Sequence, residues 1–413
     1  MLRRILILCL VLLGAGITAA GWYAYHRGFT HKWRGFVVEE FRKRGVELSL
    51  NRLTLEPFRG IVAKQVRIYD KRDRKRVIAV VDEVRLVINF ANLFKGEAFI
   101  DALDLHDANL AVPIDPSRKG GTRVEIRHLS GLLFLPPKQI YLSRFEADLY
   151  GIHVRAYGRL IDPRSEAFAA GAGAPKSADL AQTVGQIIAE LKTLNYEGTT
   201  PQIDIRFTGD LSVPDLSVEV WLWAEKVRRG TYRLENLYVN GGFRDGILRL
   251  RQLTANDADG ALRASGSYDA ASREAALQLH SGLDVHGLIG SFARITELDE
   301  YVFYAPPEID ISARATFTRP PTFQIIGHAG LKKFAYRSVI FDGFDADLSW
   351  DGERWAAIDV RLAHRTGEVT GDMLHLESDS QSSLKSTIQR KVLAPLFVGK
   401  AAEWLPRIAF SGE

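Results

Sequence analysis

The chain of 413 residues is 46% hydrophobic and 25% charged, as an average folded protein is, which excludes general disorder and a protein with many membrane spans. Its net charge of +4 comes from 54 Lys and Arg interleaved with 50 Asp and Glu, so a dedicated nucleic-acid surface, and with it a nucleic-acid partner, is not expected. Because Cys9 is the only cysteine, the chain cannot form an internal disulfide or a cysteine metal site.

A bilayer-spanning anchor is predicted within residues 1–30. The run from Ile5 to Tyr25 has no charged residue, and about 21 residues at about 1.5 Å each cover the roughly 30 Å core of a bilayer. Arg3 and Arg4 precede the run and predict a cytoplasmic N-terminus. A signal peptide cleaved after Ala20 is the alternative interpretation. The residues assigned to the anchor include Ile5, Leu12, Trp22 and Tyr23.

A β region is predicted for residues 31–200, beginning with a short amphipathic helix beside the membrane from His31 to Arg44. The apolar positions of that helix are Trp33, Phe36, Val37 and Phe41. Extended segments are expected next, at 46–55, 61–69, 77–88, 98–105 and 108–114. The basic cluster from Lys71 to Arg76 separates two of these segments. It is interpreted as a solvated hairpin tip or, alternatively, as a contact for anionic lipid headgroups.

Alternation of apolar and polar residues marks the later strands. In Ile152–Leu160 every second residue is apolar or small, and Ile309–Phe317 repeats this pattern. Such strands have one apolar face and one polar face that is exposed to solvent. This is typical of antiparallel sheets and not of parallel sheets buried under helices. The fold class expected is therefore mainly β with interspersed helices.

A short sequence motif recurs with a period of about 100 residues. Pro201-Gln-Ile-Asp-Ile returns at Pro307 and, in a weaker form, at Pro406, which gives spacings of 307 − 201 = 106 and 406 − 307 = 99. Helical periodicity precedes the three copies, at about 178–195, 288–298 and 388–404. This recurrence predicts stacked units of about six antiparallel strands and one amphipathic helix. The divisions expected are a divergent region at 31–200, units at 201–306 and 307–405, and the start of a further unit at 406–413.

Three polar tracts are predicted to be turns. Asp245-Gly246 and Asp351-Gly352 lie between strand-like runs, where a tight hairpin turn is usual. Asn256–Gly260 resembles a calcium loop, but Ala255 stands at the first ligand position and Gly266 where a bidentate Glu is needed. We therefore expect a polar turn there and no calcium site.

Motifs for catalysis or cofactor binding are not found. The histidines have no metal-pair spacing, and no nucleophile elbow, phosphate loop or dinucleotide fingerprint occurs. Asp345 and Asp347 share the wet face of a strand and are interpreted as solvated, with a glycosidase pair left open. Trp221 and Trp223 share a strand face, interpreted either as core packing under a covering layer or as a lipid or partner contact. No catalytic residue, metal or cofactor is therefore predicted, and no enzyme.

A set of short motifs follows the N-terminal apolar run. These motifs are Leu53–Gly60, Val66–Asp70, Ile78–Leu86, Asn92–Glu97 and Ile100–Leu105. This opening, over residues 1 to about 115, resembles that of AsmA-like proteins, which are envelope proteins of bacteria with two membranes. The later units resemble the family only in their general pattern of strands and glycines. Larger members of the family are much longer, so the chain is interpreted either as a natural short form or as a fragment.

The resemblance implies a long antiparallel sheet bent into a groove, apolar inside and polar outside. It also implies a single-pass anchor in the bacterial inner membrane, with the bulk of the chain in the periplasm. Relatives are linked to the movement of phospholipid towards the outer membrane as bridge-like lipid transfer proteins. The family supplies no catalytic residues to carry over.

Two functions remain open at this point. One is a membrane-anchored lipid transport protein whose groove shelters phospholipid or other acyl chains, because a long one-sided apolar sheet cannot stay exposed to water. The other is a structural scaffold or regulator of outer-membrane assembly, whose sheet is closed by a dry core and whose partners are assembly proteins. The residues expected to face the groove are Ile152, Val154, Ala156, Leu160, Leu262, Ala264, Leu277, Leu279, Ile309, Ile311, Ala313 and Phe317.

Overall fold

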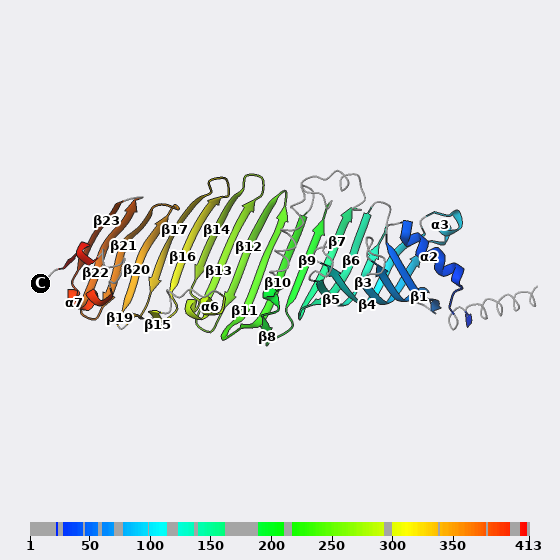
Figure 1. Ribbon diagram of the computed structural model, residues 1–413, viewed down its shortest axis with the longest axis horizontal. Helices are drawn as coiled ribbons and strands as arrows, with labels where there is room; N and C mark the ends of the chain where they lie inside the picture. The colour runs from blue at the N-terminus through cyan, green and yellow to red at the C-terminus, as the bar shows by residue number, and fades with distance from the viewer. Residues whose placement is uncertain are drawn as a thin grey trace, which may run out of the picture. The chain divides into compact units, whose positions relative to one another are not determined.

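The structure is a computed structural model (Figure 1). Two compact units make it up. It describes residues 22–23, 28–43, 46–56, 60–69, 77–97, 99–113, 123–135, 139–161, 189–209, 217–292, 300–337, 339–376, 379–396 and 405–410. Unit 1 comprises residues 1–192 and 203–216, and unit 2 comprises residues 193–202 and 217–413. The described residues are mainly β, with few helices and mostly antiparallel pairing, which confirms the predicted class.

The strands of unit 1 follow one another along the chain. They are β1 (Glu47–Glu56), β2 (Gly60–Tyr69), β3 (Val77–Ile88), β4 (Ile100–Pro113), β5 (Arg123–Phe134), β6 (Gln139–Leu149), β7 (Ile152–Ile161) and β9 (Gln202–Thr208). From β1 to β7 each strand pairs antiparallel with the next. β9 pairs with β7, and Arg155 binds Asp204 there through two hydrogen bonds of 2.6 and 2.7 Å.

Bulges and left-handed residues interrupt the alternation in unit 1 and keep its apolar side continuous. In β2, Gln65 has a left-handed φ of 53°, and Ala63 and Val66, which are three residues apart instead of two, are both buried. One extra residue exchanges the faces of all residues beyond it, so Gln65 keeps the apolar residues of β2 on one side. Residues with the same left-handed backbone occur in three more strands, as Asp107 in β4, His128 in β5 and Arg144 in β6.

One such bulge corrects the expected strand boundaries. Residues 98–105 and 108–114 are not two strands, because β4 runs unbroken from Ile100 to Pro113 with its irregularity around Asp107. The gap in the alternation that indicated a turn is therefore a bulge.

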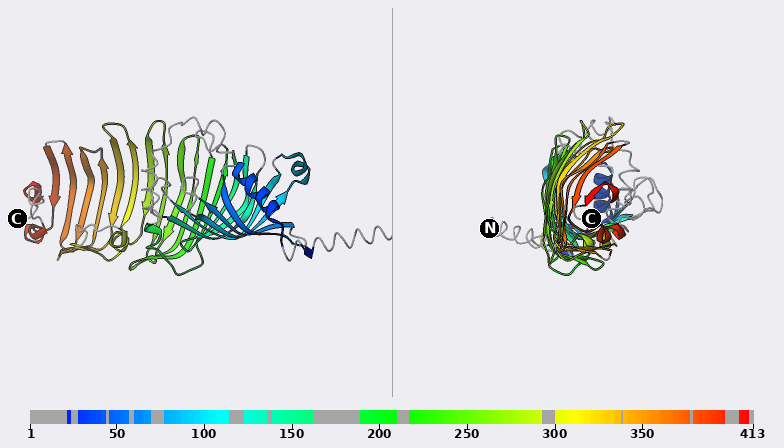
Figure 2. Two further views of the ribbon diagram at one scale, coloured as in Figure 1. Left: turned by 45° about the vertical axis from the view of Figure 1, so that its right-hand side comes forward. Right: turned by 90° about the vertical axis from the view of Figure 1, so that its left-hand side faces the viewer.

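A helix covers the apolar side of unit 1. The helix predicted from His31 is confirmed as α2 (His31–Lys43), and it lies against the first strands (Figures 1 and 2). Val37 and Phe41 of α2 are 5% and 9% exposed. They share a core with Leu48, Leu53, Ala63, Val66, Val81, Val84, Leu86, Phe99, Ile100, Ala108, Leu129 and Ala147. Unit 1 therefore has a conventional dry core.

The main sheet of unit 2 is a long meander. Its strands are β8 (Asn195–Tyr196), β10 (Ser217–Arg229), β11 (Tyr232–Arg244), β12 (Ile247–Asn256), β13 (Ala261–Asp269), β14 (Glu274–Ser281), β16 (Glu308–Thr316), β17 (Thr322–Leu331), β20 (Gly343–Trp350), β21 (Trp355–His364), β22 (Gly367–Leu376), β23 (Asp379–Ser386) and β24 (Ile408–Phe410). Neighbours pair antiparallel, except that β24 is parallel to β23. No pairing among these strands joins β24 back to β10, so the sheet is open.

Short elements gather at one end of these strands. A small second sheet consists of β15 (Tyr301–Phe303), β18 (Phe334–Tyr336) and β19 (Val339–Phe341). The helical elements are α6 (Val285–Phe292), α7 (Arg390–Leu393), η2 (Ala394–Leu396) and η4 (Leu405–Arg407). In Figure 1 the labels of α6, β15, β19 and α7 all lie at the lower ends of the unit 2 strands.

The repeated proline marks strand starts, as predicted. Pro201 and Pro307 directly precede β9 and β16, and Pro406 lies in η4 just before β24. Between successive prolines the described chain places six strands in the main sheet, β9–β14 and then β16, β17 and β20–β23. The preceding helices are shorter than expected or fall outside the described residues. Of the helix predicted at 178–195, only residues 189–191 are described. The helix predicted at 288–298 corresponds to α6, which starts before residue 288. The helix predicted at 388–404 corresponds to α7, a single turn extended by η2.

Two sequence predictions lie largely outside the described residues. These are the anchor and the basic cluster Lys71–Arg76. Of the anchor only Trp22 and Tyr23 are described, and both are helical and more than half exposed. Among the described ranges, no helix has the length and apolar character needed to cross a membrane.

Candidate functional site

An unbroken apolar row crosses unit 2 from β10 to β22. Directly paired residues of neighbouring strands lie on the same face of a sheet, and the register links one such residue on each strand to the next. In strand order they are Leu222, Val239, Leu253, Ala264, Leu279, Ile311, Gly327, Leu348, Ala357 and Met373. We call the side of the sheet that carries this row the apolar face, and the other side the polar face.

The predicted groove residues of unit 2 lie together on the apolar face. They occupy the adjacent strands β13, β14 and β16 and are Leu262, Ala264, Leu277, Leu279, Ile309, Ile311 and Ala313. Phe317 lies one residue beyond β16, and its ring is 6.1 Å from that of Tyr268 and 6.2 Å from that of Phe323. The alternation in these strands therefore identified a real, contiguous surface.

The predicted groove residues of unit 1 are in a different environment. Ile152 is 2% exposed, and Val154 and Ala156 are half-buried opposite Ala147 and Phe145 of β6. Ala147 belongs to the dry core of unit 1, and Phe145 packs against that core. The side chain of Leu160 falls outside the described part of the structure.

The middle of the apolar face in unit 2 has no covering layer. None of the apolar side chains of β13, β14, β16 and β17 is buried, and all of them are described. Large side chains on this face remain exposed to a degree unusual for a sheet interior. The exposed fractions are 39% for Leu277, 42% for Leu348, 41% for Trp350, 54% for Leu248 and 47% for Phe317.

The two ends of the strands differ in what lies on the apolar face. At the end that carries α6, the small sheet and α7, buried clusters cover the strands. One contains Ala255 and Leu283, and another joins Phe334 and Phe341 to Leu393. At the other end a line of rings follows the hairpins, and we call it the aromatic rim. It consists of Tyr268, Phe317, Phe323 and Trp350, with successive ring centroids 6.1, 6.2 and 6.0 Å apart.

A half-buried carboxylate organises the covered end. Asp257 accepts hydrogen bonds from the backbone N–H groups of Asp259, Gly260 and Asp284, at 2.8 to 2.9 Å, and from the hydroxyl of Tyr232 at 2.8 Å. Burial opposes ionisation of Asp257, but these bonds outweigh it and hold the pKa of its carboxyl below the ordinary value. Burial, with the bond to Asp257, raises the pKa of Tyr232 far above its ordinary value. The tract at 256–260 is thus the polar turn that we expected.

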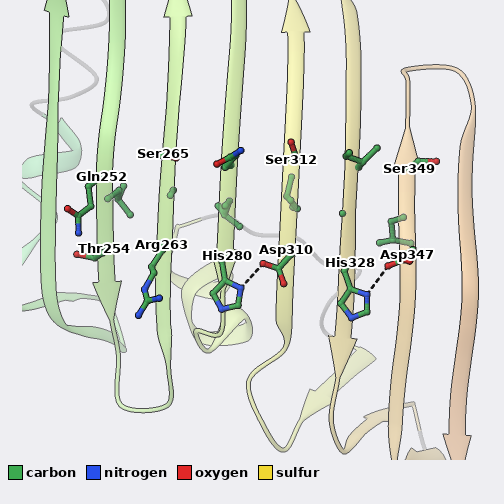
Figure 3. A pocket seen from close by; sticks show the side chains of 18 of the residues that line it. Gln252, Thr254, Arg263, Ser265, His280, Asp310, Ser312, His328, Asp347 and Ser349 are labelled. Atoms are coloured by element: carbon green, nitrogen blue, oxygen red, sulfur yellow. Dashed lines mark hydrogen bonds and ion pairs between the residues drawn. The ribbon is translucent and has the colours of Figure 1, made fainter.

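The polar face carries a shallow depression of about 890 Å³ between β12 and β21 (Figure 3). Two rows of side chains line it. One row is Thr254, Arg263, His280, Asp310, His328 and Asp347, and the other includes Gln252, Ser265, Gln278, Ser312 and Ser349. Between them run residues of the apolar row, whose side chains project to the other face.

Cross-strand pairs of histidine and aspartate occupy this depression. The Nδ1 of His280 is 2.6 Å from Oδ1 of Asp310, and the Nδ1 of His328 is 2.9 Å from Oδ1 of Asp347 (Figure 3). The Nε2 of His328 is also 3.2 Å from Asp345. The hydrogen bond to Asp347, with the charge of Asp345, raises the pKa of His328 above its ordinary value. Asp345 and Asp347 thus both contact His328, and no described group of His, Cys, Asp and Glu is arranged to hold a metal ion.

Sequence reasoning missed two parts of the site. It did not extend the apolar row to β10–β12 and β20–β22, although Val220, Leu222 and Ala224 alternate there too. It also missed the aromatic rim, whose members are adjacent only through strand pairing. Trp223 lies on the polar face with an exposed fraction of 41%, so its interpretation as core packing is wrong.

Comparisons with protein-family models, curated proteins and solved structures find no match for this chain. The resemblance to AsmA-like proteins therefore stays a prediction that depends on the motifs at the start of the sequence.

Proposed function

We propose that the protein binds acyl lipids, phospholipids above all, along the apolar face of unit 2 and conducts them without catalysis. In this proposal the N-terminal run anchors the chain in the inner membrane of a bacterium with two membranes. The bulk of the chain lies in the periplasm and passes lipid towards the outer membrane. The apolar face is the floor of a groove that shelters acyl chains.

The middle of the apolar row, which has no buried apolar side chain on β13, β14, β16 and β17, is the observation that carries this proposal. Exposed apolar surface costs about 25 cal/mol per Å² in water, so a face that has no protein cover favours another apolar occupant. An acyl chain makes no hydrogen-bonding demand, and each methylene sheltered from water contributes about 0.8 kcal/mol. Ten strands at about 4.8 Å spacing give a row of about 43 Å, which exceeds the roughly 30 Å hydrocarbon core of a bilayer.

The aromatic rim supports a lateral opening to this groove. Because α6, the small sheet and α7 cover the other end of the strands, lipid reaches the face at the hairpin end. The rings there are large and apolar, and the indole N–H of Trp350 and the hydroxyl of Tyr268 are polar. Such amphipathic rings suit the boundary between acyl chains and headgroups.

Matched aspartate variants test the proposal. Ile311 lies on the apolar face, and Ser312, the next residue of β16, lies on the polar face. Residues 31–413 are purified without detergent as wild type, Ile311→Asp and Ser312→Asp, and bound phospholipid is measured by mass spectrometry. We expect lipid in the wild type and in Ser312→Asp, and much less in Ile311→Asp. A folded wild-type protein without lipid would contradict the proposal and favour a scaffold role.

A further inference from the structure

Helices α2 and α3 (Phe90–Lys95) form an exposed aromatic surface on unit 1. Trp33 and Phe36 of α2 are 45% and 59% exposed, and Phe90 and Phe94 of α3 are 57% and 86% exposed. Val37 and Phe41 of α2 already pack in the core, so these aromatic residues are not needed to hold the helix in place. We call Trp33, Phe36, Phe90 and Phe94 the α2–α3 surface.

Helix α3 is held in shape by its caps and not by burial. The side chain of Asn89 accepts a hydrogen bond from the N–H of Asn92 at the start of the helix. At its end Gly96 has the left-handed conformation, with a φ of 73°, that commonly ends helices. No residue of α3 is buried. Leu93 packs against the core of unit 1, whereas Phe90 and Phe94, four residues apart on one face of the helix, are exposed.

An apolar cavity of about 170 Å³ lies beneath this surface. It is lined by apolar side chains alone, from α2, α3 and the adjoining strands. Trp33 and Phe36 line it from α2, Phe90 and Leu93 from α3, and Phe99 from the chain just before β4. A cavity without polar groups does not hold ordered water and favours an apolar guest.

The surface is tied to the predicted anchor by a short connection. The N–H of Phe29 donates a 2.7 Å hydrogen bond to the carbonyl of Leu53 in β1, so the chain is fixed to the sheet there. The apolar run ends at Tyr25, four residues earlier. Four residues reach at most about 14 Å, so an anchored chain holds this part of unit 1 against the bilayer. Exposed Lys32 and Lys95, next to Trp33 and Phe94 in sequence, favour anionic headgroups.

We propose that the α2–α3 surface is seated in the interface of a phospholipid bilayer and that the cavity beneath it takes the end of one acyl chain. The proposal rests on the membrane anchor of the proposed function, but it needs no lipid on the apolar face of unit 2. It gives unit 1 a lipid-binding site of its own at the membrane surface.

Environment-sensitive probes test the seating. In the full chain carrying Cys9→Ser, a single cysteine replaces Phe36, Phe94 or Arg42 and carries a nitrobenzoxadiazole label. Arg42 is the control, because it lies nine residues from Trp33 on α2, about 180° around the helix, and half of its side chain is exposed. In vesicles of phosphatidylethanolamine and phosphatidylglycerol, we expect the labels at 36 and 94 to shift to shorter emission wavelengths and to lose quenching by iodide. Equal iodide quenching at all three positions would overturn the proposal.

A photoreactive lipid tests the cavity. A phospholipid with a diazirine at the end of one acyl chain should crosslink to peptides containing Leu93 or Phe99. Leu93→Trp, which fills the cavity, should remove these crosslinks and leave the probe results unchanged. Crosslinks confined to residues 5–25 would overturn the cavity assignment. Lipid bound to unit 2 is measured separately, so failure here and failure of the proposed function are distinguishable.

Discussion

Units 1 and 2 are built from similar one-faced strands, yet they treat the apolar face in opposite ways. In unit 1 helix α2 inserts Val37 and Phe41 against the strands, and residues such as Val66 of β2 are 5% exposed or less. In unit 2 no apolar side chain of β13, β14, β16 or β17 is buried. Alternation therefore shows that a sheet has one apolar side, but the covering element decides whether that side is a core or a binding surface.

The largest expected effect comes from placing a charge on each apolar face. Val66→Asp buries an unpaired carboxylate in unit 1 and should cost about 3–5 kcal/mol of unfolding free energy. Ile311→Asp leaves its carboxylate in reach of water on the open face of unit 2, so the loss should stay below about 1 kcal/mol. Urea unfolding of both variants measures the difference. Similar losses in the two units would mean that the apolar face of unit 2 is a dry core.

Cavity formation sharpens the same contrast. Leu86→Ala, in the core of unit 1 at 4% exposure, should destabilise the protein by about 2–5 kcal/mol. Leu279→Ala removes the same atoms from the half-buried apolar row of unit 2 and should cost about 1 kcal/mol or less without lipid. Thermal unfolding with and without added phospholipid measures both, and lipid should stabilise the wild type more than Leu279→Ala.

The half-buried carboxylate of Asp257, at the covered end of unit 2, should affect acid unfolding. Asp257→Ala leaves three backbone N–H groups and the Tyr232 hydroxyl without their acceptor, for a loss of about 2 kcal/mol. Since the folded-state pKa of Asp257 is lowered, its contribution is complete above the ordinary carboxyl pKa near 4 and is lost as the pH falls through the folded value. The variant should lose part of the dependence of stability on pH below about 4. A variant with the wild-type acid slope would contradict this role.

The smallest effect is expected on the polar face. The pKa of His328 is raised by Asp347 and Asp345, so its stabilising contribution is complete below the ordinary histidine pKa near 6.5 and is lost as the pH rises through the folded value. The effect should be slight, because 39% of the His328 side chain is exposed and water screens the pairs. His328→Gln should flatten the stability profile above the ordinary histidine pKa and leave bound lipid unchanged. NMR titration of the imidazole checks the direction of the shift.

Local patterns in the sequence predicted much of the fold. Alternation predicted the faces of β7 and β16, helical spacing predicted α2, and Asp245-Gly246 is the two-residue turn between β11 and β12, with φ values of 53° and 77°. Asp351 also begins a hairpin turn, where its side chain accepts hydrogen bonds from the N–H groups of Glu353 and Arg354. Each of these signals lies within a few neighbouring residues.

What the sequence could not predict depends on contacts between distant segments. The bulge at Asp107 resembles a strand break, because an inserted residue interrupts the alternation without ending the pairing. The aromatic rim joins Tyr268 to Trp350 only through the register of the strands between them. The core that contains Val66 includes Val37 and Phe41 of α2, a helix that precedes the first strand. No similar pattern in the sequence marks the absence of a cover over Ile311.

Photocrosslinking from one pair of adjacent residues tests the central claim most directly. Leu279 and Gln278 are neighbours on β14, with Leu279 on the apolar face and Gln278 on the polar face. A benzoylphenylalanine is placed at either position of the full chain in its native membranes, and adducts are identified by mass spectrometry after illumination. The proposed lipid-binding face predicts phospholipid adducts at position 279 and few or none at 278. Equal adducts at both positions, or protein adducts alone at 279, would contradict it.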